Sequence, residues 1–147
     1  MRTRASGGFT LFEALVTTAI SLTVLAIGLP NLVRLRAPYA LSGATRQITA
    51  DLQAARQRAI ARNVRYRVTF NGVSNTYTIE REQTGAFIAD SAPQPLPAGA
   101  KLGTVTPGNP VFDTRGMLAA QVTVPVTVTG SGTRTVTINV LGKTTTN

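Results

Sequence analysis

The first pattern along the chain is a long run of apolar residues near the N-terminus. From Phe9 to Leu29 there are 21 residues, of which only Glu13 is charged. A helix rises about 1.5 Å per residue, so a helix of this length spans roughly 30 Å, the thickness of the hydrocarbon core of a bilayer. The run therefore predicts a membrane-spanning helix.

A second pattern, with the period of a helix, extends from Tyr39 to about Arg62. Apolar or small residues recur at spacings of three or four, and most polar side chains lie off this stripe. This predicts an amphipathic helix that packs on the rest of the protein. Pro30 lies between the two patterns, where it either kinks or interrupts a helix or marks the plain end of the membrane helix. The stripe consists of Leu41, Ala44, Ile48, Leu52, Ala55 and Ala59.

The remaining sequence alternates with a period of two, as β-strands do. The segments VRYRVTF (64–70) and TYTIERE (76–82) flank a turn and predict a hairpin. A second hairpin is predicted for QVTVPVTVT (121–129) and RTVTINVL (134–141), joined by GSGT, with Pro125 at a sheet edge or bulge. The segment VFDTRGML (111–118) predicts a strand that runs into a turn. Residues 83–110, with five prolines, predict mostly surface loop with a short strand near Lys101–Val105.

The eight residues before the apolar run, MRTRASGG, are short, basic and end in glycine. Arg2 and Arg4 favour a cytoplasmic N-terminus by the positive-inside rule. An ordinary secretory signal places its small residues after the apolar stretch, whereas here they precede it. Cleavage at Gly8 would remove the charged leader and keep the apolar segment.

The composition narrows the function further. With 15 Lys and Arg against 6 Asp and Glu, the net charge is +9, which favours anionic partners such as nucleic acid or lipid. The chain has no Cys and no His, which excludes a Cys/His zinc cluster, a Cys nucleophile and a Ser-His-Asp triad. The acidic residues form no acid/base pair. We therefore expect a protein that is not an enzyme and binds no cofactor or metal.

The segment GFTLFEALV (8–16) resembles the prepilin signature of type IV pilins and pseudopilins. That signature joins a short basic leader ending in glycine to an apolar helix with glutamate at the fifth mature position. The resemblance implies that a prepilin peptidase cuts after Gly8 and methylates the new N-terminus at Phe9. The mature chain would then be residues 9–147.

The rest of the chain resembles the FimT/GspH branch of minor pilins. Phe112 lies shortly before Arg115-Gly116, and the last predicted strand is followed by Gly142 and Lys143. The resemblance implies an α+β protein with the type IV pilin fold, in which a long N-terminal helix packs on an antiparallel β-sheet domain. The expected parts are a leader (1–8), a transmembrane and polymerisation helix (9–36) and a periplasmic globular domain (37–147), helical to about residue 62.

The resemblance also implies a role for Glu13 in contacts between subunits. A carboxylate in hydrocarbon is costly and needs a partner. In the family that partner is the α-amine at Phe9 of a neighbouring subunit in the filament. The alternative is an incidental glutamate near the interface of a signal anchor.

The arginines suggest a second kind of site. A cluster at the junction of helix and first strand is a candidate for gripping DNA phosphates, and a C-terminal pair is another. The alternatives for the cluster are a solvated helix face or contacts with Glu80 and Glu82 across the hairpin. In some similar pilins a DNA-binding tail carries Gly and two Arg, whereas here only Lys143 follows Gly142. The candidates are Arg56, Arg58, Arg62, Arg65, Arg67, Arg134 and Lys143.

Together these observations predict a minor type IV pilin that inserts in the inner membrane and assembles into, or primes, a pilus. The expected partners are prepilin peptidase, major and minor pilins, membrane lipid and, for DNA uptake, double-stranded DNA. The alternative is a GspH-type minor pseudopilin of a type II secretion system.

Overall fold

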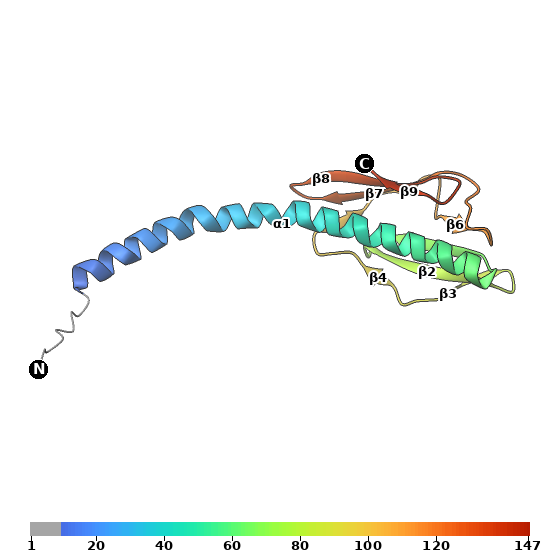
Figure 1. Ribbon diagram of the computed structural model, residues 1–147, viewed down its shortest axis with the longest axis horizontal. Helices are drawn as coiled ribbons and strands as arrows, with labels where there is room; N and C mark the ends of the chain where they lie inside the picture. The colour runs from blue at the N-terminus through green and yellow to red at the C-terminus, as the bar shows by residue number, and fades with distance from the viewer. Residues whose placement is uncertain (1–9) are drawn as a thin grey trace, which may run out of the picture. The chain divides into compact units, whose positions relative to one another are not determined.

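A computed structural model describes residues 10–147, with the side chains of 29–35 left outside the description. The chain divides into two compact units, Met1–Arg36 and Ala37–Asn147. A single helix, α1 (Leu11–Arg62), contributes to both units, and all strands belong to the second (Figure 1).

Helix α1 continues through Pro30 without a break in its secondary structure, so of the alternatives open at Pro30 neither an interruption nor the end of the helix is observed. An interior proline removes one hydrogen bond, here the bond to the carbonyl of Ala26, and this loss alone does not end a helix. The helix ends at Arg62, where Asn63 adopts a positive φ of 52°. Asn is one of the few residues that tolerate this left-handed conformation at a helix C-terminus.

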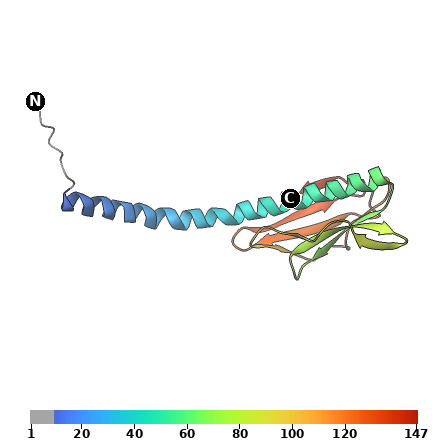
Figure 2. The same cartoon turned by 90° about the horizontal axis from the view of Figure 1, so that it is seen from below.

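The second part of α1 lies beside both sheets (Figures 1 and 2). Its apolar stripe belongs to one buried cluster with residues of both sheets. This confirms the amphipathic helix predicted from the sequence. The fully buried positions recur every three or four residues along the helix. Residues at this spacing are neighbours on a helix surface, so the buried positions share one face. All six residues of the predicted stripe are at most 3% exposed: Leu41, Ala44, Ile48, Leu52, Ala55 and Ala59.

The first sheet has the order β3-β2-β1-β6, with β4 paired to β2. The predicted hairpin is formed by β1 (Tyr66–Asn71) and β2 (Thr76–Gln83) in antiparallel register. Alternate residues of both strands are buried, as period-two patterning requires. The short strand β6 (Val111–Phe112) closes one edge of this sheet against β1.

Two strands of the first sheet lie in the stretch 83–110 that was expected to be mostly loop, so that expectation was too broad. They are β3 (Ala86–Ala89) and β4 (Gln94–Pro95). Thr84 and Gly85 form the two-residue connection between β2 and β3, and both have positive φ. Such turns match the twist of a hairpin. Gly85 was therefore the sequence signal for β3, and the strand was missed because it is only four residues long and shows no alternation of polar and apolar residues.

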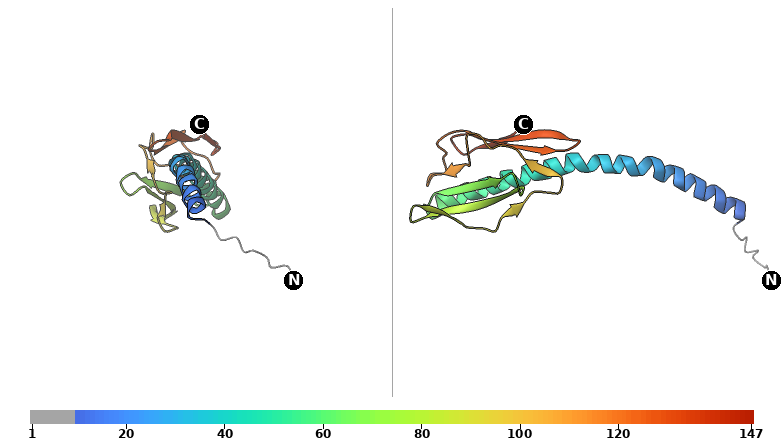
Figure 3. Two further views of the ribbon diagram at one scale, coloured as in Figure 1. Left: turned by 90° about the vertical axis from the view of Figure 1, so that its left-hand side faces the viewer. Right: turned by 180° about the vertical axis from the view of Figure 1, so that it is seen from behind.

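The second sheet has the order β5-β7-β8-β9 and contains the second predicted hairpin, β7 (Val122–Val128) with β8 (Gly132–Ile138). The strand expected near Lys101–Val105 is β5 (Ala100–Leu102). The edge strand β9 (Thr144–Thr146) was not predicted. It forms by backbone hydrogen bonding to β8, and such pairing does not require alternating apolar residues in its sequence. Figure 3 shows this sheet and the first one beside α1.

Pro125 lies in β7, an internal strand, which corrects the expectation of an edge. Proline has no N–H to donate, so within a sheet it fits only where the neighbouring strand offers no carbonyl that needs that hydrogen bond. That place is the segment just beyond the end of β5, where Gly103 N–H donates to the Pro125 carbonyl at 2.8 Å. A Cβ on Gly103 would lie 2.7 Å from Pro125 Cγ, so the glycine makes room for the proline ring.

Candidate functional site

The first candidate site is the start of α1. Gly8 and Phe9, the expected cleavage and methylation residues, lie outside the described residues. Thr10 precedes the helix, and its Oγ1 accepts a hydrogen bond from the Glu13 backbone N–H at 3.2 Å. This is the N-cap arrangement that satisfies one of the free N–H groups of a first turn. The carboxylate of Glu13 also lies where the positive end of the helix dipole favours it.

The helix that follows is long and apolar enough to cross a membrane. Over Leu11–Gly28 the mean hydropathy is 1.9, and none of this segment is buried. Leu11, Phe12 and Ile27 are 71% exposed or more. A soluble protein seldom leaves so large an apolar surface open, so the segment needs lipid or other helices around it.

The hydroxyl groups in this segment are satisfied within the helix. Thr17 Oγ1 donates to the carbonyl of Glu13 at 2.7 Å, and Thr18 Oγ1 donates to that of Ala14 at 2.7 Å. Ser21 and Thr23 make the same bond to the preceding turn. Polar groups bonded in this way add little cost in hydrocarbon. Glu13 is then the one ionisable group among residues 10–28.

The second candidate site, the arginine cluster, is held largely by carboxylates. Asp90 is the centre: Arg58 and Arg62 on α1 approach it at 3.3 and 3.0 Å, and Arg81 on β2 approaches it at 3.6 Å. The hydroxyl of Tyr66 also donates to Asp90, at 3.2 Å. The side chain of Asp90 is 12% exposed, so it ties the end of α1 to the first sheet.

Arg65 and Arg67 form a ladder with the opposite strand of the hairpin. Arg65 Nε donates to Glu82 at 2.7 Å, and Arg67 Nε donates to Glu80 at 2.8 Å. The guanidinium of Arg67 also lies 4.4 Å from the centre of the Phe87 ring. Hydrogen bonding and charge from Arg65 lower the pKa of Glu82. These are the cross-hairpin contacts offered as the alternative to DNA binding.

Arg56 is engaged elsewhere and has a structural task. Its Nε donates to the carbonyl of Gly116 at 3.0 Å. Gly142 lies against the same guanidinium, since a Cβ built on it would lie 2.6 Å from Arg56 Nε. Gln53, one turn earlier, donates to Thr144 Oγ1 at 2.6 Å. These contacts lock α1 to the loops before β7 and after β8.

The two C-terminal candidates are separate from the cluster. The guanidinium of Arg134 donates to Ser42 Oγ on α1 at 3.1 Å. Lys143 follows Gly142 in the turn before β9, and its backbone N–H donates to Asn139 Oδ1 at 2.8 Å. The structure therefore brings only Arg58 and Arg62 together, at Asp90, and pairs Arg65 and Arg67 with glutamates of β2. Arg56 lies against Gly142, the neighbour of Lys143, and Arg134 contacts the beginning of the globular unit's part of α1.

Two residues at the cluster were not singled out by the sequence. They are Asp90, which joins three arginines, and Arg81. Arg81 continues the alternation of the buried Tyr77 and Ile79 but is itself exposed. A charge that continues the apolar face of a strand indicates an ion pair at the rim of that face, so the signal was present.

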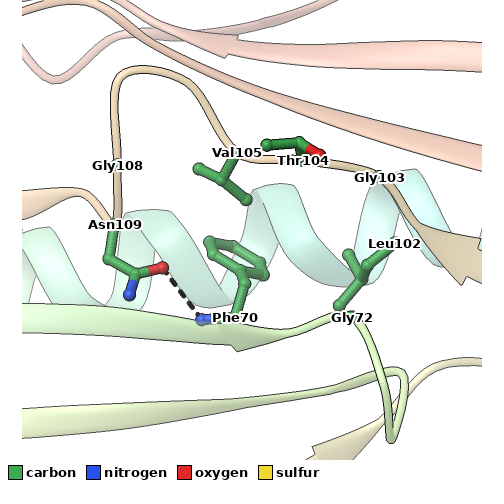
Figure 4. Close-up of a pocket in the computed structure, with 8 residues that line it drawn as sticks. All are labelled: Phe70, Gly72, Leu102, Gly103, Thr104, Val105, Gly108 and Asn109. Atoms are coloured by element: carbon green, nitrogen blue, oxygen red, sulfur yellow. Dashed lines mark hydrogen bonds between the residues drawn. The ribbon is translucent and has the colours of Figure 1, made fainter.

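No group of three or more potential metal ligands exists among the residues that the structure describes. An open groove of about 430 Å³ lies between the β1–β2 hairpin and the segment after β5 (Figure 4). Its lining has no titratable side chain, and Asn109 closes it by accepting from Phe70 N–H at 3.1 Å. The groove offers shape and backbone groups but no acid, base or nucleophile.

Residues 44–142 match the model of the family described as type II transport protein GspH. The fold is similar to that of the minor pilin FimU from Pseudomonas aeruginosa, with 16% identity, a TM-score of 0.60, and coverage of 73% of this chain and 87% of that one. A second crystal form of FimU gives 17% identity and a TM-score of 0.59, covering 73% of this chain and 92% of that one.

The minor pseudopilin EpsH from the type 2 secretion system of Vibrio cholerae is similar to the same degree. It shares 13% identity with a TM-score of 0.61, over 73% of this chain and 95% of that one. The comparison with curated sequences found no significant match. The structural likenesses confirm the type IV pilin fold expected from the sequence.

Proposed function

Because the chain belongs to the GspH family of minor pilins and pseudopilins, we propose that it is a minor type IV pilin. In this proposal α1 anchors the chain in the inner membrane, with the globular unit in the periplasm, until the subunit enters or primes a pilus. Members of the family are structural subunits, so the protein is not an enzyme.

The observation that carries the proposal is the uncovered apolar helix with one carboxylate in its first turn. Leu11–Gly28 has no buried residue, and Glu13 is exposed at its start. Lipid covers such a surface before assembly, and neighbouring helices cover it in a filament. Both surroundings leave Glu13 in need of a positive partner.

The partner that we propose is the α-amine of Phe9 on a neighbouring subunit. That amine is created when prepilin peptidase removes residues 1–8, so an uncleaved chain lacks it. Attraction between the two charges in a medium of low polarity would then favour the processed subunit in assembly.

The second candidate is a minor pseudopilin of a type II secretion system. The equal likeness to FimU and EpsH supports both machines. Deletion of the gene separates them: loss of surface pili supports the pilus role. Loss of enzyme secretion with normal pili supports the pseudopilin role.

The test of the proposal itself is the pair Glu13→Gln and Glu13→Ala. Both remove the charge, and the first keeps the size of the side chain. We expect sheared surface pili to fall severely, while immunoblots still show a cleaved chain in the membrane fraction. Ser21→Ala is the matched control, since its hydroxyl bonds only within α1. Normal piliation with both Glu13 variants would refute the polymerisation role.

A further inference from the structure

The globular unit 37–147 has an excess of positive charge that is unevenly placed. It contains eleven Lys and Arg against five Asp and Glu. Four of those carboxylates are paired with arginine. The fifth, Asp51, accepts a hydrogen bond from Tyr77. The acidic groups are therefore all engaged, and the unpaired cations determine which surface attracts anions.

Several of these cations lie at the end of the unit where its part of α1 begins. This end is made of residues 37–47 together with the segments 97–102 and 129–134. Arg134 contacts Ser42 there, and Ala100 pairs with Val128 just before the β7–β8 turn. These three segments contain Arg46, Lys101 and Arg134 and no Asp or Glu. No carboxylate lies within ion-pair distance of these cations in the described part of the chain.

An exposed aromatic residue belongs to the same surface. Tyr39 is 74% exposed. Tyr39, Ser42 and Arg46 follow one another at helical spacings of three and four, so they share a face of α1. The guanidinium of Arg134 reaches the middle of that face through Ser42. We call Tyr39, Ser42, Arg46 and Arg134 the basic end.

Covalent connection keeps the basic end near the membrane. Only eight residues separate Gly28, the end of the apolar segment, from Ala37. Even fully extended, these residues span no more than about 30 Å. Tyrosine is enriched at membrane interfaces, and arginine near anionic lipid is attracted to the surface.

We propose that the basic end docks on the anionic headgroups of the bilayer that anchors the protein. The contact rests on the membrane anchoring proposed above and adds a surface of the globular unit to it. Arg46 and Arg134 contact lipid phosphates, and Tyr39 inserts its ring at the headgroup level. The contact holds the subunit at the membrane before assembly, and extraction into a filament breaks it.

A soluble fragment of residues 37–147 is suited to the test, because it has its own core. Every residue of the main buried cluster lies between Leu41 and Ile138. The probes are vesicles of phosphatidylcholine with and without about one quarter phosphatidylglycerol, read by co-sedimentation. The variants are R46Q/R134Q and Y39A, with R115Q/K143Q as a control of equal charge change. Arg115 and Lys143 are both exposed and lie outside the basic end.

The expected result is binding to phosphatidylglycerol vesicles that weakens with salt and is absent for pure phosphatidylcholine. R46Q/R134Q weakens it about tenfold or more, Y39A weakens it several-fold, and R115Q/K143Q changes it less than twofold. Equal losses in the two double variants, or no binding by the wild type, would overturn the inference. So would R46Q/R134Q losing affinity for a 30-base-pair duplex while vesicle binding is unchanged. These failures leave the Glu13 experiment unaffected, because the fragment lacks residue 13.

Discussion

Arg56 and Gly116 are joined by a hydrogen bond of 3.0 Å from the arginine Nε to the glycine carbonyl, across 60 positions of sequence. Gly116 has a φ of +76°, and a Cβ on it would lie 2.7 Å from Ile60 Cδ1. Gly142 lies on the other side of the same guanidinium. A residue first considered for DNA binding therefore holds the helix to the loop before β7 and the turn after β8.

Gly142→Ala should destabilise the globular unit strongly. The substitution combines a positive φ of 75° with a Cβ that would lie against the backbone carbonyl of Gly116 and 2.6 Å from Arg56 Nε. We expect a loss of about 2–4 kcal/mol in the free energy of unfolding, measured by urea titration of residues 37–147. Gly130→Ala is the matched control, because Gly130 has a φ of 85° but open space around it. Its cost should be about 1 kcal/mol. Equal costs at the two positions would show that the close packing of Gly142 on Arg56 and the Gly116 carbonyl is unimportant.

Asp90→Asn should loosen the end of α1. The substitution leaves Arg58, Arg62 and Arg81 facing one another without a carboxylate between them. These arginines are 40–54% exposed, so solvent moderates the effect, and we expect a loss of about 1–2 kcal/mol. Hydrogen exchange should quicken at the amides near Arg62. Arg115→Gln, which breaks an exposed pair, should change neither quantity, and similar behaviour of the two variants would contradict the central role of Asp90.

Acid should destabilise the unit through Glu82 and Asp113. The ion pair with Arg65 lowers the pKa of Glu82, and the N–H of Met117 is the main group that lowers the pKa of Asp113. Both groups bind protons less readily in the folded state than in the unfolded one. Their contribution is therefore complete above the unfolded pKa values, near 4, and is lost as pH falls below them.

The measurement is the melting temperature of residues 37–147 between pH 7 and pH 3. E82Q should show a shallower decline below pH 5 than the wild type, because it lacks one of the two carboxyl groups whose pKa is lowered by folding. An identical pH profile for E82Q and wild type would show that the ion pair contributes nothing to the pH dependence.

The globular unit should bind DNA weakly, and its affinity for DNA should fall only slowly as salt rises. Most of the arginine cluster faces carboxylates, so few cations are left to release counterions from phosphate. We expect log K against log salt to fall with a slope of about −2 to −3, since each phosphate contact contributes roughly −0.9. Fluorescence anisotropy with duplex DNA measures this slope. A slope steeper than about −5 would show that the cluster opens to bind DNA.

Much of the fold followed from periodicity alone. The six-residue stripe from Leu41 to Ala59 predicted the packed face of α1, and both long hairpins were located. The misses share a cause. Strands β3, β4 and β9 are short edge or near-edge pieces whose residues are not alternately buried, so backbone pairing rather than burial forms them.

The candidate sites were less accessible to sequence reasoning. A dense group of arginines predicts a positive surface, but the approach of Asp90 depends on how β3 folds back along β2. Arg56 looked equivalent to Arg58, although one contacts a carbonyl and the other a carboxylate. The role of Glu13 with Gly8 and Phe9 remains a prediction that the filament experiments test.

The fit between Gly103 and Pro125 has a consequence for how this sequence can change over time. The proline ring occupies the space that a side chain at position 103 would need. A larger residue at 103 is therefore acceptable only after position 125 has lost its ring. Relatives that keep this sheet should vary at the two positions jointly, and an alignment of them would reveal the pair as a correlated substitution.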